Sequence, residues 1–219
     1  MRKVVFAVLC SFLFILVVVI DINQGYTHFR DSNDIRSATK RKGTTSSASS
    51  QKKPLIIYFS RSGTNYPNVH LKIGHTKQLA MFISDKTHGD QYEIVPAKPY
   101  PKNYQRTVDQ AQREQQNNLR PSIKGKLHDV SKYRTIFIGY PIWWNEPPMI
   151  VRTFMDHENL NGKTIIPFST NEGSGWGDSL QIIKRYYPQS HFLKGFSVTG
   201  SAVDNDHSRV NRWLAKLGY

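Results

Sequence analysis

The sequence has a single cysteine, Cys10, and little negative charge relative to its positive charge. One cysteine cannot form a disulfide within the chain and cannot supply a cysteine metal cluster. The 30 Lys and Arg residues outnumber the 16 Asp and Glu residues, which gives a formal net charge of +14. Residues 1–53 hold 9 basic and 3 acidic side chains, so +8 belongs to residues 54–219. Charge alone does not decide whether the partner is a nucleic acid, an anionic lipid or an acidic protein.

Several functional motifs are also absent. No Gly-Lys-Ser/Thr triplet follows a strand, which excludes an ATP or GTP loop, and no Gly-x-Gly-x-x-Gly dinucleotide motif occurs. Basic residues form one tight cluster, at 40–42, and are not interleaved with aromatic residues, so we expect no nucleic-acid partner. The histidines lack the spacing of metal ligands, and no Ser-His-Asp order is apparent. We therefore assign no metal site and no catalytic residues.

One long apolar run is present, from Val4 to Ile20, and Arg2 and Lys3 precede it. About 20 apolar residues suffice to cross a bilayer. No small-x-small cleavage site precedes Asp21, which favours an uncleaved signal-anchor transmembrane helix over residues 1–22. A cleaved signal peptide or a wholly cytoplasmic chain are the alternatives. The positive charges before the run predict a single-pass protein whose soluble domain is extracytoplasmic. Residues 23–53, rich in Ser, Thr and Lys, predict a disordered linker.

Residues 54–219 alternate between two hydrophobic periods, which predicts a single α/β domain. The expected strands cover 55–59, 92–95, 135–140, 164–168 and 192–198, and the expected helices cover 76–86, 104–117, 147–158, 179–187 and 204–217. Such alternation predicts a five-stranded parallel sheet with right-handed crossovers and helices on both faces. Ligands of such sheets bind beyond the carboxyl ends of the strands. The loops after the first, third and fourth strands are therefore the candidate site.

The loop after the first strand carries Ser60, Arg61 and Ser62, and His75 and Thr76 follow where a helix should begin. Hydroxyl groups and a helix amino terminus favour an anion such as a phosphate. The same residue types cap many helices that bind no ligand, and this alternative stays open.

The other two loops suit a flat ligand. The loop after the third strand contains Trp143 and Trp144, whose large surfaces are costly to leave in water. They could also close the core edge or form a partner surface. The fourth strand leads into the stretch 169–177, where three glycines allow close approach of the backbone to a ligand, or simply a flexible loop.

Together these loops resemble the flavodoxin family, in the branch whose third loop reads Tyr-Pro-Ile-Trp-Trp, and the resemblance extends over residues 54–217. It includes Pro99-Tyr100-Pro101 and the segments 151–154 and 162–168. The resemblance implies a flavodoxin-like doubly wound sheet of order 2-1-3-4-5 and one non-covalent FMN. It implies that the phosphate contacts Ser60, Ser62, His75 and Thr76, with Arg61 adding charge. The ring would lie between two loops whose amides reach its polar edge, formed by Pro141, Ile142, Trp143, Trp144 and Asn145 and by Ser169, Thr170, Asn171, Gly173, Ser174 and Gly175.

The sequence departs from the family pattern at several positions. His75 stands where Asn is common, and an insert, 66–73, divides the phosphate loop. Asn145 replaces a glycine whose peptide is thought to flip on flavin reduction, and Asn is among the few other residues that tolerate positive φ. Glu172 brings a carboxylate towards the flavin and would shift its potential.

The resemblance favours a membrane-tethered electron carrier that exchanges electrons with a redox protein, a quinone or another small acceptor. An NAD(P)H-dependent quinone or flavin reductase with the same cofactor is the first alternative. A tethered binding module that has lost the flavin is the second. Whether the protein is an enzyme therefore stays open.

Overall fold

The computed structural model describes residues 53–219. The transmembrane helix expected over 1–22 lies outside these residues, as does the expected linker apart from Lys53. Among residues 53–219, no helix is both long enough and apolar enough to span a bilayer.

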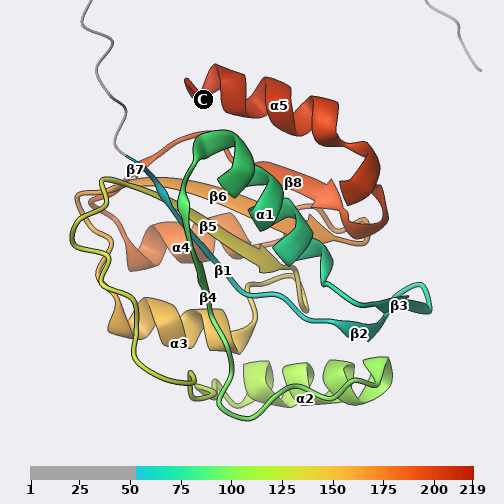
Figure 1. The fold of residues 1–219 in the computed structure, drawn as a ribbon. Coiled ribbons are helices and arrows are strands. Elements are labelled where there is room, and N and C mark those ends of the chain that lie inside the picture. Colours follow the sequence, from blue (N-terminus) through green and yellow to red (C-terminus); the bar gives the residue numbers. More distant parts are fainter. Residues whose placement is uncertain (1–52) are drawn as a thin grey trace, which may run out of the picture. The chain divides into compact units, whose positions relative to one another are not determined.

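A parallel sheet forms the centre of the described domain (Figure 1). Its strands are β1 (Leu55–Tyr58), β4 (Asp90–Glu93), β5 (Thr135–Pro141), β6 (Thr164–Asn171), β7 (His191–Phe192) and β8 (Phe196–Thr199). They run in the order β4-β1-β5-β6, and β7 and β8 both pair with the free edge of β6. The expected order 2-1-3-4-5 is confirmed, with the fifth position shared by two short strands. All four residues of β1 are buried, as expected for a strand covered on both faces.

The break between β7 and β8 corrects the single strand expected over 192–198, and Pro167 accounts for it. The carbonyl of Ile165 accepts a hydrogen bond from Leu193 N at 3.0 Å, so this side of β6 faces the fifth position. Pro167, two residues on, faces the same side and has no N–H to donate. Gly195 packs so closely here that a Cβ would come within 2.5 Å of Pro167 O. The ladder therefore resumes only at Phe196.

Helices cover both faces of the sheet (Figure 1). On one face lie α1 (His75–Thr87) and α5 (His207–Lys216), which follows the 3-10 helix η1 (Gly200–Asn205), and on the other lie α3 (Met149–His157) and α4 (Ser179–Tyr186). The helix α2 (Tyr104–Gln116) packs beside α3. Alternate β1 residues serve the two cores, since Ile56 belongs to the cluster under α1 and α5, and Ile57 to the cluster under α3 and α4.

Most expected boundaries agree with the structure to within two residues, but β6 extends three residues further, to Asn171, and the last helix divides into η1 and α5. The insert adds an antiparallel hairpin that the sequence did not predict, formed by β2 (Gly63–Asn65) and β3 (Val69–Leu71). Its strands have only three residues each, which is too few to establish a hydrophobic period. The hairpin lies beside the carboxyl end of β1, next to the candidate site.

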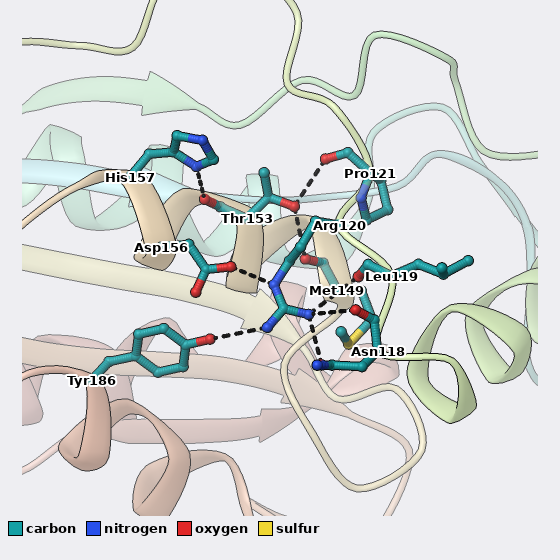
Figure 2. A network of polar contacts seen from close by, with 9 residues as sticks. All are labelled: Asn118, Leu119, Arg120, Pro121, Met149, Thr153, Asp156, His157 and Tyr186. Carbon is teal, nitrogen blue, oxygen red and sulfur yellow. Dashed lines mark hydrogen bonds and ion pairs between the residues drawn. The ribbon is translucent and has the colours of Figure 1, made fainter.

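A polar network holds the segment after α2 against α3 and α4 (Figure 2). The Arg120 guanidinium bonds to the Asp156 carboxylate of α3, to the hydroxyl of Tyr186 at 3.4 Å and to Oδ1 of Asn118 at 2.8 Å. Thr153 Oγ1 donates to the backbone of the same segment at 2.9 Å. These contacts fix the long connection between α2 and β5 away from the candidate site.

Candidate cofactor site

A cavity of about 370 Å³ lies at the carboxyl ends of β1, β5 and β6. This size is typical of small-molecule sites. Its lining comes from all three predicted loops and from the hairpin: Ser60, Arg61, Asn65, Tyr66, Leu71, His75, Thr76, Tyr104, Pro141, Ile142, Trp143, Thr170, Asn171, Glu172 and Ser174. The loops after the first, third and fourth strands therefore meet, as the sequence predicted.

One end of the cavity is the amino terminus of α1. Gly74 is the N-cap and supplies no side-chain bond, while Ser60 Oγ accepts from Lys77 N at 3.1 Å. The first-turn amides of His75 and Thr76 have no acceptor within the helix. A Cβ on Gly74 would lie 2.3 Å from Arg61 O, so only glycine allows this approach. Free amides, a helix dipole and the Ser60 hydroxyl proton make this end suitable for an anion.

The buried hydroxyls of Thr76 and Thr170 join this helix terminus to β6. Their Oγ1 atoms are 2.7 Å apart, and the side chains are 1% and 4% exposed. A second contact between α1 and the segment after β6 lies beside this one, where Nδ1 of His75 is 3.8 Å from Oε1 of Glu172. Burial lowers the pKa of His75 and raises the pKa of Glu172.

Arg61 lies in the cavity wall, but its N–H groups point to protein acceptors. Nε and one Nη bond to Pro101 O at 3.1 and 2.7 Å, and further bonds reach Lys102 O and Thr64 O at 2.8 Å each and Asn65 Oδ1 at 3.1 Å. The guanidinium thus fastens the β2–β3 hairpin to the loop after β4. The sequence assigned this guanidinium to the phosphate, but in the structure each of its nitrogens donates to an acceptor within the protein.

The tryptophan pair divides between two roles. Trp143 lines the cavity and packs edge-on against Phe59 and Tyr100, with interplanar angles of 89° and 87°. Trp144 turns to α2, where its Nε1 donates to Val108 O at 3.2 Å, and it is 45% exposed. Reciprocal hydrogen bonds of 3.0 Å between the backbones of Trp143 and Glu146 close a two-residue hairpin turn, and we call residues 143–146 the tryptophan hairpin. Trp144 and Asn145 occupy that turn with φ of 49° and 66°, both in the left-handed region.

Asn171 shapes the glycine-rich loop. Its Oδ1 accepts from Gly173 N at 2.8 Å and Gly175 N at 3.1 Å, while its Nδ2 donates to Ser197 Oγ at 3.0 Å. Both glycines have positive φ, of 108° and 61°. The two amides that the sequence assigned to the polar edge of a flavin are thus bonded to Asn171, and Ser174 is the loop residue that faces the cavity.

The cavity brings together most of the predicted site residues. Those that line it are Ser60, Arg61, His75, Thr76, Pro141, Ile142, Trp143, Thr170, Asn171 and Ser174, and those outside its lining are Ser62, Trp144, Asn145, Ser169, Gly173 and Gly175. Ser62 is exposed, and Ser169 is buried with its hydroxyl bonded to Ser197 Oγ at 2.8 Å. Glu172, which the sequence placed near the flavin, also lines the cavity, and the lining residues that the sequence did not indicate are Asn65, Tyr66, Leu71 and Tyr104. These four residues belong to the hairpin segment or to α2, and no pattern in the sequence indicated that either lies near the site.

Within residues 53–219, no group of three or more His, Cys, Asp or Glu side chains is placed to hold a metal ion.

A second cavity of about 270 Å³ adjoins the first, between α2 and the tryptophan hairpin. It shares Arg61, Asn65, Tyr104 and Trp143 with the first and adds Thr107, Val108, Ala111 and Trp144.

Comparison with known proteins agrees with this architecture. The sequence pattern of the flavodoxin family matches residues 53–217. A protein classed as a flavoprotein from Bacteroides eggerthii is 31% identical, with a TM-score of 0.59, over 76% of this chain and 98% of the other. Its counterpart from Bacteroides uniformis is 30% identical, with a TM-score of 0.59, over 73% and 97%. A Lactobacillus acidophilus flavoprotein in complex with FMN is 24% identical, with a TM-score of 0.54, over 70% and 97%. No curated protein matches the chain. With this pattern matched over three quarters of its length, and with the sheet order that the pattern implies, the chain belongs to the flavodoxin family.

Proposed function

We propose that the protein binds one FMN in the larger cavity and uses it to transfer electrons. The observation that carries the proposal is one cavity that has a helix amino terminus suited to an anion at one end and the Trp143 ring at the other. The fold relative from Lactobacillus acidophilus was solved in complex with FMN, which supports the same ligand here.

The residues present fit this cofactor. The amides of His75 and Thr76 and the hydroxyl of Ser60 would hold the phosphate. Trp143 and Ile142 would give the ring an apolar surface. FMN supplies one- and two-electron chemistry, while the surrounding protein sets its potentials. Trp143 is held by two edge-on aromatic contacts, so the ring meets a surface that needs no rearrangement.

Binding is tested by titrating the full chain with FMN and following quenching of flavin fluorescence. Ser60→Ala removes a hydroxyl at the helix terminus and should weaken FMN binding about tenfold, the effect of one charge-assisted hydrogen bond. Ser62→Ala is the matched control, because Ser62 is exposed outside the cavity and should leave affinity unchanged. A protein that stays colourless after incubation with FMN would instead support a flavin-free binding module.

Electron carrier is the function we favour within this proposal, and reductase is the second candidate. The adjoining cavity of about 270 Å³ supports the reductase, since its apolar and aromatic walls could hold an acceptor such as a quinone. Rapid mixing of the FMN-loaded protein with NADPH separates them: fast bleaching without a partner protein indicates a reductase. Stepwise chemical reduction in two resolved one-electron stages, without bleaching by NADPH, indicates a carrier. An acidic redox protein is then the expected partner.

We also propose that the apolar run from Val4 to Ile20 anchors the protein in a membrane, with the flavodoxin domain on the extracytoplasmic side. The length of the run and the basic residues before it support this arrangement. Protease added to intact cells should remove the domain, whereas a cytoplasmic domain would be degraded only after lysis. Recovery of the protein in the soluble fraction would contradict the anchor.

A further inference from the structure

The anion-binding end of the cavity contains an acid–base pair, His75 and Glu172. Both side chains line the cavity, are 16% and 28% exposed, and bring Nδ1 and Oε1 to 3.8 Å. Their approach depends on Gly200, where a Cβ would lie 2.1 Å from His75 Nδ1 and 2.4 Å from Glu172 Oε1. A carboxylate is therefore built into the part of the cavity where the helix terminus favours an anion.

The surroundings favour the uncharged form of each partner. Burial lowers the pKa of His75, although the carboxylate of Asp204 on η1 acts in the opposite direction. Burial raises the pKa of Glu172, against the effect of the Gly200 backbone N–H. The other charged or titratable groups that line the cavity are Arg61, whose donors are occupied, and the phenols of Tyr66 and Tyr104. No free cation among the lining residues balances an ionised Glu172 and a phosphate dianion together.

We propose that His75 and Glu172 make the cavity sense the charge of the flavin's phosphate, so that FMN binds with uptake of about one proton. This inference rests on the proposed function. The proton that enters with FMN resides on His75, on Glu172 or on the phosphate, and in each case it reduces the repulsion between the phosphate and the carboxylate. The pair thus sets how strongly the site prefers FMN over riboflavin, which lacks the phosphate.

Two consequences follow. FMN affinity falls as pH rises, because binding takes up a proton and the proton concentration falls. For uptake of one proton the affinity falls by up to tenfold per pH unit. The phosphate's own second pKa, near 6, contributes below pH 7. Riboflavin has no charged tail, so its affinity should be nearly independent of pH. The preference for FMN is then greatest in mild acid and smallest above pH 8.

The test measures dissociation constants of FMN and riboflavin for the full chain at pH 6, 7 and 8. The ratio of the FMN constant to the riboflavin constant should rise severalfold per pH unit. Glu172→Gln removes the carboxylate and should tighten FMN binding at least about fivefold at pH 8, the effect of a like-charge contact of about 4 Å screened as strongly as in bulk water, while riboflavin binding stays unchanged. Glu172→Gln should also flatten the dependence on pH, because no carboxylate then remains whose repulsion the proton would reduce. Glu158→Gln is the matched control, because Glu158 follows α3 at the opposite end of the sheet.

Calorimetry in two buffers of different ionisation enthalpy gives an independent readout, since proton uptake makes the apparent binding enthalpy depend on the buffer. About one proton should enter with FMN and none with riboflavin. A pH-independent ratio, or a Glu172→Gln effect equal for both flavins, would overturn the inference while leaving FMN binding intact. Failure of both flavins to bind would overturn the proposed function itself, and this inference with it.

Discussion

The Arg61 side chain fastens the β2–β3 hairpin to the loop after β4. Its guanidinium donates hydrogen bonds to Pro101 O, Lys102 O, Thr64 O and Asn65 Oδ1. The planar fork of arginine can make such a set of bonds, and the single ammonium of lysine cannot.

We therefore expect Arg61→Lys to behave more like Arg61→Ala than like the unchanged protein. The variant keeps the charge but loses most of the bonds that hold the hairpin, so the free energy of unfolding should fall by about 1–2 kcal/mol. FMN affinity should fall as well, because the hairpin residues Asn65, Tyr66 and Leu71 line the cavity. Urea unfolding and FMN titration measure the two effects. If Arg61 served the phosphate only as a charge, Arg61→Lys would keep both stability and affinity.

For individual residues, the sequence could predict which residue types would come together at the carboxyl edge of the sheet. Ser60, Thr76, Trp143 and Thr170 follow buried strands or begin a helix, and parallel strands end at one edge of a sheet. Which polar atoms stay free could not be predicted. The amides of Gly173 and Gly175 are taken by Asn171 through a side-chain rotamer, which no spacing in the sequence specifies.

Among the structural elements, the tryptophan hairpin places its two turn residues in left-handed backbone. Asn145 has φ of 66°, and its carbonyl accepts from Asp178 N at 2.7 Å. Glycine adopts this conformation freely, whereas a Cβ without a compensating amide costs about 1–2 kcal/mol.

Asn145→Gly should leave the free energy of unfolding within about 0.5 kcal/mol of its original value, and Asn145→Ala should lower it by about 1 kcal/mol. Asn68, with φ of 70° in the β2–β3 hairpin, should respond in the same way. Asn211→Ala is the control, since Asn211 is exposed within the helix α5. Urea unfolding of the five variants, two at Asn145, two at Asn68 and one at Asn211, is the measurement. Equal stability of the alanine and glycine variants at 145 would contradict the strain argument.

The edge strand β4 carries an acid-sensitive contact. Asp90 accepts from Lys53 Nζ at 2.6 Å and from the Tyr133 hydroxyl at 2.7 Å, and these hydrogen bonds lower its pKa. Because the pKa in the folded protein is below the unfolded value, the contact stabilises above about pH 4 and this stability is lost as pH falls through the folded value. Asp90→Asn should lower stability at pH 7 but have less effect at pH 3. Asp85→Asn, at an exposed position of α1, is the control for urea unfolding at both pH values.

The elements themselves were largely predictable, because buried parallel strands and amphipathic helices have distinct hydrophobic periods. Two features were not predicted, for different reasons. Pro167 signals a gap in one neighbouring ladder, but only the pairing of β6 reveals that the gap faces the fifth strand. The strands of the β2–β3 hairpin have only three residues each, too few to show a period, and contacts from outside such as the hydrogen bond from Thr64 N to Lys102 O, 3.0 Å, hold the hairpin in place.

The excess of positive charge over the entire domain should govern its encounters with redox partners. Residues 54–219 carry a net charge of +8, and exposed Lys72 and Lys102 adjoin the cavity-lining hairpin and the loop bonded to Arg61. A positive field concentrates anions near the surface and raises their association rate, and salt reduces the effect as the screening length falls from about 30 Å at 0.01 M to about 3 Å at 1 M.

The FMN-loaded, reduced full chain should therefore react with ferricyanide, an anionic oxidant, more slowly as salt increases, by about tenfold or more over that range. The rate with a cationic oxidant such as hexaammineruthenium(III) should rise as salt increases. The rate with a neutral quinone should change little, which controls for effects of salt on the flavin itself. Stopped-flow absorbance gives all three rates. Since the steering depends on the charge near the cavity, Lys72→Glu with Lys102→Glu should reduce the salt dependence for ferricyanide. Equal salt dependence for the anion and the cation would show that the net charge does not act at the electron-transfer surface and would remove the argument for an acidic partner.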